Sequence, residues 1–143
     1  MEGPPRLCPI ETNDDALTFD IVCSTSLSSR CSAAFMHGTE VVSRVEFDTK
    51  ECEIECVWTR LDHANRGLAT RAMRSALRDI EKKGGCRSVG LFVFPVRRTD
   101  YRRLVDFYSR FGFKPASSVD VSRIDRKIPC TLIARIGRKE GEE

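Results

Sequence analysis

The segment from Thr59 to Thr70 (TRLDHANRGLAT) leads from an extended stretch into a helical one through small and polar side chains. The first amides of a helix have no partner within the helix, and the helix dipole places partial positive charge on them. An anion such as phosphate is their natural ligand. Gly67 lets the backbone approach a ligand closely, Ala69 adds little bulk, and Arg66 brings a fixed charge. The segment therefore predicts an anion site made of main-chain amides, those of Asn65, Gly67, Leu68, Ala69 and Thr70.

The anion is not predicted to be a nucleoside triphosphate or a dinucleotide. The chain has no G-x-x-x-x-G-K-[ST] motif, and no G-x-G-x-x-G follows a strand. The run from Ala64 to Ala69 (ANRGLA) instead resembles motif A, [QR]-x-x-G-x-[GA], of the GNAT superfamily of N-acetyltransferases. In that family the backbone amides of the motif hold the pyrophosphate of acetyl-CoA. Ala64 departs from the Gln or Arg of the family's first position, which removes one polar contact.

A second segment strengthens this resemblance. Residues 107–115 (FYSRFGFKP) are similar to the family's motif B, a helix end of the form [LF]-Y-x-x-x-G-F. The two motifs stand in the family's order, and the resemblance covers residues 51–115 well. It implies that Tyr108 lies beside the sulfur of coenzyme A and protonates the departing thiolate. The alternative is an inward aromatic residue at helical spacing whose hydroxyl bonds to backbone.

The segment from Thr59 to Thr70 forms the corner between a strand and a helix. The resemblance also implies a role for the strand that precedes this corner. Its last residues would pair with the pantetheine arm and offer a backbone N–H to the thioester carbonyl. The cofactor-binding residues predicted in this way are Val57, Trp58, Thr59, Ala64, Asn65, Arg66, Gly67, Leu68, Ala69 and Thr70.

Transfer to an amine requires a base, because an ammonium group cannot attack a thioester. The strand from Glu51 to Thr59 places the carboxylates of Glu51, Glu53 and Glu55 at alternate positions, and therefore on one face. Glu53 lies where many family members carry a glutamate base, so it is the first candidate and Glu55 the second. The alternative is the solvated face of an edge strand.

A covalent acyl-enzyme is not expected. Cys56 or Cys86 would need a partnering His, and the sequence indicates none. Seven cysteines contain no C-x-x-C pair, and His37 and His63 are the only imidazoles, so the sequence predicts no metal site. The odd number of cysteines and the lack of an apolar leader predict free thiols in a reducing cytoplasm.

The elements that must position these residues follow from hydrophobic periodicity. Helices are predicted over 66–83, ended by Gly84 and Gly85, and over 99–111, capped by Thr99. Strands are predicted over 16–24, 32–36, 40–47, 51–59, 89–94 and 131–136. This order predicts an α/β fold with a mixed sheet, formed by a single domain over 1–143 with loose ends at 1–13 and 137–143.

One departure from the family concerns the acceptor side. Family members usually carry one or two helices between the first two strands, whereas residues 23–31 are too few for them. The fold is therefore expected to be GNAT-like with these helices reduced or absent. An open acceptor side favours a bulky acceptor, such as a protein N-terminus or lysine, over a small caged amine. It also leaves room for a homodimer.

Composition agrees with a small globular enzyme. The chain has 143 residues, of which 41% are hydrophobic and 31% charged, and its net charge is +3. The charge excess is too small to predict nucleic-acid binding, and no apolar run reaches the length of a membrane span.

The sequence thus predicts an acetyl-CoA-dependent N-acetyltransferase that moves an acetyl group to a primary amine by direct attack in a ternary complex. The alternative is a GNAT-like acyl-CoA-binding protein with a regulatory role and little turnover. Ala64 and Tyr101 motivate this alternative, because many family members carry an Asn that contacts the cofactor where Tyr101 stands.

Overall fold

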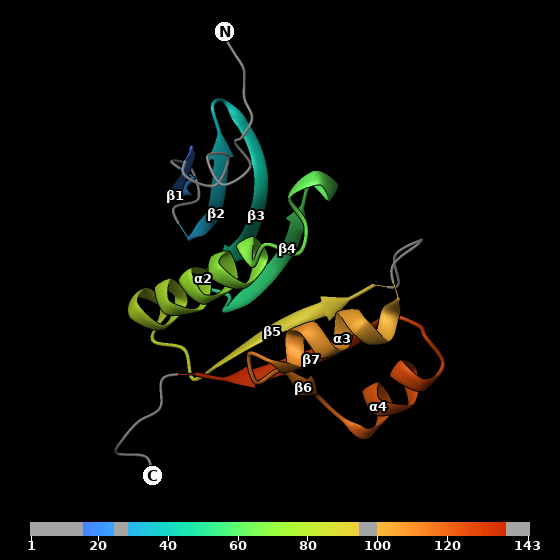
Figure 1. Ribbon diagram of the computed structural model, residues 1–143. Helices are drawn as coiled ribbons and strands as arrows, with labels where there is room; N and C mark the ends of the chain where they lie inside the picture. Colours follow the sequence, from blue (N-terminus) through green and yellow to red (C-terminus); the bar gives the residue numbers. More distant parts are fainter. Residues whose placement is uncertain (1–15, 25–28, 95–99, 137–143) are drawn as a thin grey trace, which may run out of the picture.

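The computed structural model describes residues 16–24, 29–94 and 100–136. Its centre is a seven-stranded mixed sheet with the strand order β1-β2-β3-β4-β5-β7-β6 (Figure 1). The predicted α/β fold is therefore confirmed. In chain order the elements are β1 (Leu17–Cys23), β2 (Arg30–His37), β3 (Glu40–Asp48), β4 (Glu53–Thr59), η1 (Leu61–His63), α2 (Leu68–Gly84), β5 (Ser88–Val93), α3 (Tyr101–Ser109), β6 (Lys114–Pro115), α4 (Ser118–Asp125) and β7 (Cys130–Arg135).

The first four strands form an antiparallel meander that α2 covers on one face (Figure 1). Alternation along β2 and β3 directs Ala33, Val45 and Phe47 toward the helix, and each is at most 1% exposed. The apolar stripe of α2 faces them with Met73 and Ile80, which are fully buried. This packing fixes the start of α2 relative to the end of β4.

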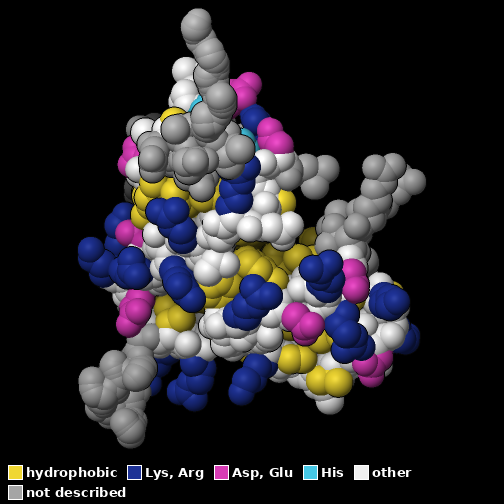
Figure 2. Space-filling view, viewed as in Figure 1, with side chains coloured by type: hydrophobic (Ala, Val, Ile, Leu, Met, Phe, Trp, Pro, Cys, Tyr) yellow, Lys and Arg dark blue, Asp and Glu magenta, His cyan; other side chains and the backbone are white. Residues whose placement is uncertain are grey.

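The sheet opens between β4 and β5. These strands run parallel, but only Glu53 with Gly90 and Ile54 with Leu91 are paired. Beyond these pairs the two strands diverge, so the sheet splits into an upper half under α2 and a lower half under α3 (Figure 1). Hydrophobic side chains are visible between the two helices, flanked by Lys and Arg side chains (Figure 2). The opening is the feature of the fold that creates space for a ligand.

The face opposite α2 and α3 keeps large hydrophobic side chains in contact with solvent. Val22 is 62% exposed, Trp58 42%, Phe92 49% and Ile133 41%. Only residues 24–29 separate β1 from β2, in agreement with the expected reduction of the helices between them. No described helix is both long enough and apolar enough to cross a membrane.

The prediction of free thiols is wrong for four cysteines. Cys23 and Cys31 face each other across β1 and β2 and form a disulfide. Cys52 lies in the turn before β4, with a φ of 59°, and forms a disulfide with Cys86 in the α2–β5 connection. Both pairs depend on chain segments that only the fold brings together. The free cysteines among the described residues are Cys56 and Cys130.

Several elements also differ from prediction. The second helix begins at Tyr101 because the side chain of Asp100 accepts a hydrogen bond from Arg102 N at 3.0 Å, and the predicted cap Thr99 lies outside the described residues. Strand β4 starts at Glu53, because Asp48 Oδ1 accepts hydrogen bonds from the amides of Lys50 and Glu51 and holds a turn there. Helix α4, capped by Ser117, was not predicted. The predicted loose ends, 1–13 and 137–143, lie outside the described residues.

Candidate active site

The start of α2 leaves its first amides available. Gly67 is the N-cap, with a φ of 78°, and no side chain caps the helix there. The helical ladder begins with Arg71 N donating to Gly67 O at 3.0 Å, so the amides of Leu68, Ala69 and Thr70 have no acceptor in the helix. A Cβ at Gly67 would meet no atom within 4 Å. Glycine is therefore required here by its backbone angle and not by lack of space.

A cavity of about 420 Å³ adjoins this helix start. Thr59, the corner residues and the end of α3 line it together, which places motif A beside motif B. The lining residues are Thr59, His63, Ala64, Asn65, Gly67, Leu68, Ala69, Thr70, Phe107 and Arg110. Arg66, Val57 and Trp58 are not among them. Sequence reasoning missed Phe107 and Arg110, which lie one helical turn apart at the end of α3.

The backbone of β4 presents alternate residues to the opening. Arg60 N donates to Val42 O at 2.8 Å, which continues the antiparallel ladder between β3 and β4. Because hydrogen-bonded pairs alternate in such a ladder, the polar backbone groups of Trp58 point to β3 and those of Val57 and Thr59 point away from it. Ser43 Oγ also donates to Trp58 O at 3.2 Å. The predicted main-chain contact is thus available at Val57 and Thr59, but not at Trp58.

A second cavity, of about 260 Å³, lies where β4 and β5 diverge. Tyr108 lines it together with Cys56, Val57 and Leu104. Tyr108 is 8% exposed, and burial raises its pKa to about 12, with a further contribution from the nearby Cys56. The Tyr108 hydroxyl therefore remains a proton donor at neutral pH.

Tyr101 has a different environment. Its hydroxyl donates to Ile128 O at 2.8 Å and lies 3.3 Å from Cys130 Sγ. Burial and the hydrogen bond to Cys130 raise the pKa of Tyr101 above its ordinary value. This tyrosine ties α3 to the chain before β7, and its hydroxyl is engaged in that contact.

The two candidate bases line a third cavity, of about 390 Å³, on the exposed face of the sheet. Gly90, Phe92, Phe94 and Thr131 complete its walls together with Ile54 and Leu91. Phe92 and Phe94 were not predicted as site residues, and their rings meet edge to face with centroids 4.9 Å apart. Their alternate positions in the sequence place both rings on one face of the sheet, and this spacing could have indicated that they lie together.

The three strand carboxylates have different surroundings. Glu51 lies in the turn before β4 and does not line the cavity. A register shift between Glu46 and Phe47 leaves Glu55 without a partner in β3, and its carboxylate lies 3.9 Å from Arg30 Nη2. No described residue forms an ion pair with Glu53. Of the two carboxylates that line the cavity, Glu53 is therefore the one without an ion pair to a described residue.

His63 is held as part of the corner. It is 7% exposed, and its Nδ1 lies 3.0 Å from Asp62 Oδ1. Asp62 also accepts two hydrogen bonds from the guanidinium of Arg60, at 2.8 and 2.9 Å, which hold the pKa of Asp62 well below its ordinary value.

Comparisons with known proteins give the class of this fold. The model of the acetyltransferase (GNAT) family matches residues 31–113, which is more than half of the chain. The chain therefore belongs to the GNAT family. No curated protein sequence gave a significant match.

Solved structures share the fold at low sequence identity. The PaiA N-acetyltransferase of Thermoplasma acidophilum, in complex with coenzyme A, matches with a TM-score of 0.59 and 16% identity over 79% of this chain. The chain spans 65% of that protein's length. A GNAT family acetyltransferase of Elizabethkingia anophelis with acetyl-CoA bound gives a TM-score of 0.59 and 11% identity, over 85% of this chain and 99% of that one. Ard1 of Thermoplasma volcanium gives 0.55 and 18%, over 78% and 72%.

Proposed function

We propose that this protein is an acetyl-CoA-dependent N-acetyltransferase that acts by direct attack of a primary amine in a ternary complex. The observation that carries the proposal is a row of backbone N–H groups along the opening between β4 and β5 that have no hydrogen-bond acceptor in the sheet or the helix. They begin at Val57 and Thr59 on the free edge of β4 and end at the uncapped amides of α2. Such a row suits a ligand with an extended amide-bearing arm and a diphosphate, as in acetyl-CoA.

In this proposal the diphosphate binds the amides of Gly67, Leu68, Ala69 and Thr70, with Asn65 and Arg66 at the same turn. The cavity at this corner supports the assignment, because it is bounded by main-chain donors and by Arg110. Ala64 provides only a methyl group there. The backbone therefore supplies most of the binding.

The chemistry is divided among three groups. Glu53 accepts a proton from the substrate ammonium, directly or through water, and the resulting amine attacks the thioester carbonyl. The amide of Val57 stabilises the negative charge that develops on the carbonyl oxygen. As the carbon–sulfur bond breaks, Tyr108 donates its proton to the thiolate. Glu55 is the second candidate base, with its ion pair to Arg30 as the argument against it.

The acceptor is proposed to reach the thioester from the exposed face of the sheet, where Glu53 lies beside Phe92 and Phe94. This cavity carries both carboxylates and aromatic rings, which suits a cationic amine. A protein N-terminus or lysine is the proposed acceptor class, and a small amine is the alternative.

A specific observation favours a second function, that of a cofactor-binding protein with little turnover. The Tyr101 hydroxyl is engaged with Ile128, so it cannot replace the cofactor contact that an Asn makes in many relatives. Titration calorimetry with acetyl-CoA, beside a thiol-release assay over a panel of amines and peptides, separates the two functions. Binding with thiol release supports the transferase, binding without release on every acceptor supports the second function, and absence of binding contradicts both.

A further inference from the structure

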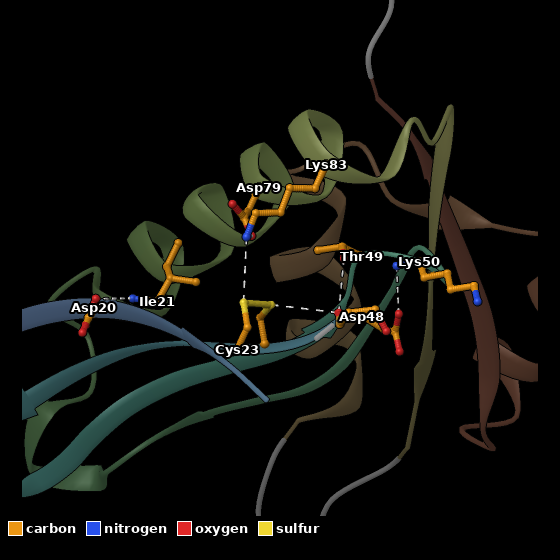
Figure 3. Close-up of a disulfide and its surroundings, with 10 residues drawn as sticks. Asp20, Ile21, Cys23, Asp48, Thr49, Lys50, Asp79 and Lys83 are labelled. Atoms are coloured by element: carbon orange, nitrogen blue, oxygen red, sulfur yellow. Dashed lines mark hydrogen bonds and ion pairs between the residues drawn. A yellow bond between two sulfur atoms is a disulfide. The ribbon is translucent and has the colours of Figure 1, made fainter. Parts of the chain in front are cut away.

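Three potential metal ligands meet beneath α2, away from the opening between β4 and β5. Cys23 is on β1, Cys31 is on β2 and Asp79 is on α2. The sulfur atoms and a carboxylate oxygen of these residues lie within 4.8 Å of one another. Figure 3 shows the disulfide below the helix, with Asp79 and Lys83 directed toward it. Among the described residues, this is the one group of three or more His, Cys, Asp or Glu side chains that lie close enough together to hold a metal ion.

The carboxylate of Asp79 has an incomplete environment. Its side chain is 14% exposed, and its Oδ2 is buried and accepts no hydrogen bond. A buried carboxylate oxygen without a hydrogen bond is costly, and an ion pair with a half-exposed lysine compensates this cost only in part. The nearest cation is Lys83 Nζ, which lies 3.2 Å from this oxygen and 3.8 Å from Cys23 Sγ. The side chain of Lys83 is 51% exposed and can turn into solvent if another cation takes its place.

The two sulfurs cannot bind a metal while they are bonded to each other. Opening the disulfide gives two thiols on neighbouring strands, at directly opposed positions of the β1–β2 register. Tetrahedral zinc with Zn–S bonds of about 2.3 Å separates two ligand sulfurs by roughly 3.8 Å. Two sulfurs that already face each other need only a small movement to reach that separation.

We propose that the reduced protein binds one zinc ion through Cys23, Cys31 and Asp79, with water as the fourth ligand. The metal and the disulfide are mutually exclusive states of one site. Both the disulfide and the bound metal cross-link the edge strand β1 to β2. The metal also cross-links both strands to α2 through Asp79. This site is not predictable from the sequence, because its two cysteines are not arranged in a C-x-x-C pair.

The exchange between the two states balances as follows. A dithiol reductant opens the disulfide and becomes oxidised, and zinc then replaces the two thiol protons as two Zn–S bonds form. In the reverse direction hydrogen peroxide takes two electrons from the sulfurs. The S–S bond forms, the zinc ion is released, and the peroxide takes up two protons and becomes two molecules of water.

Cobalt(II) is the probe, because sulfur ligands give it an absorption band from charge transfer in the near ultraviolet. The full-length protein is reduced with a phosphine and titrated with cobalt(II), and zinc is then added in competition. The expected result is one metal ion per chain with a sulfur band, and no such band in the oxidised protein. A reduced wild-type protein without a sulfur band would overturn the proposal.

Matched variants locate the site. C23S/C31S is expected to lose the band, while C52S/C86S, which removes the other disulfide, is expected to keep it. Asp79→Asn is expected to weaken metal binding at least tenfold. Its control is Glu81→Gln, which removes an exposed carboxylate from the same helix and is expected to change nothing.

The Asp79→Asn variant keeps the test decisive if C23S/C31S fails to fold, since it retains both sulfurs. Retention of the wild-type band in C23S/C31S would overturn the site. Equal metal affinities for Asp79→Asn and Glu81→Gln would overturn the role of the carboxylate and, with it, the proposed ligand set.

Discussion

The substitution Thr70→Glu tests whether the start of α2 binds a diphosphate. Thr70 is the third residue of the helix and lines the cavity at the corner. A glutamate in the first turn of a helix interacts favourably with the helix dipole, by about 0.3–1 kcal/mol. The variant should therefore fold at least as stably as the wild type. Any loss of cofactor binding then cannot be attributed to unfolding.

The expected loss follows from charge repulsion. A carboxylate about 5 Å from a phosphate charge is repelled by about 1–3 kcal/mol for effective dielectric constants between 80 and 20. The Kd for acetyl-CoA should therefore rise by roughly five- to 150-fold at low ionic strength. Added salt should reduce the difference between variant and wild type, because the corner is open to solvent.

Ser75→Glu is the matched control. It introduces the same side chain and charge on α2, but more than one turn beyond the corner and outside the cavity. Titration calorimetry with acetyl-CoA and thermal unfolding are measured for both variants. The reasoning fails if Thr70→Glu binds as tightly as the wild type, or if both variants lose affinity equally.

Three further predictions concern the chemical step. Glu53→Gln should lower kcat by about a hundredfold or more, as expected for loss of a general base, without changing the Kd for acetyl-CoA, and Glu55→Gln should lower it less; a larger effect at Glu55 would reassign the base. Tyr108→Phe should lower kcat more than it raises KM. Because burial raises the pKa of Tyr108 to about 12, this hydroxyl stays protonated and should add no descending limb to the wild-type rate profile below about pH 10. The contribution of the protonated hydroxyl to the free energy of unfolding is complete below the unfolded pKa of about 10 and is lost as the pH rises toward 12. The free energy of unfolding of Tyr108→Phe should therefore fall less steeply with pH than that of the wild type over this range. Cys56→Ala should keep turnover largely intact, and a fall of more than a hundredfold would contradict direct attack.

The sequence predicted the fold well where local signals and packing agree. The apolar stripe of α2 and the unbroken apolar run of β5 gave the helix and the strand close to their observed bounds. The stripe of α2 is buried on the face that its pattern indicates, whereas the unbroken run of β5 predicts burial on both faces and the structure leaves Phe92 49% exposed. The transition from strand to helix was also predictable from the small and polar side chains of the corner, whereas the positive φ of Gly67 was not.

The remaining features depend on register and on distant contacts. The direction of the Trp58 backbone is set by its pairing with β3, and a one-residue change would have reversed it. The engagement of Glu55 by Arg30 joins β4 to β2 across the sheet. The two disulfides likewise join segments that are distant in the sequence or separated by a turn. None of these contacts has a signature in a short stretch of sequence.

A crystal structure of the protein with acetyl-CoA is the most direct test of the account. We expect the diphosphate oxygens within hydrogen-bond distance of the amides of Leu68, Ala69 and Thr70. The pantetheine arm should lie along β4, with its amides bonded to the backbone of Val57 or Thr59. A cofactor bound elsewhere on the protein, or a diphosphate held only by side chains with these amides unoccupied, would contradict the account.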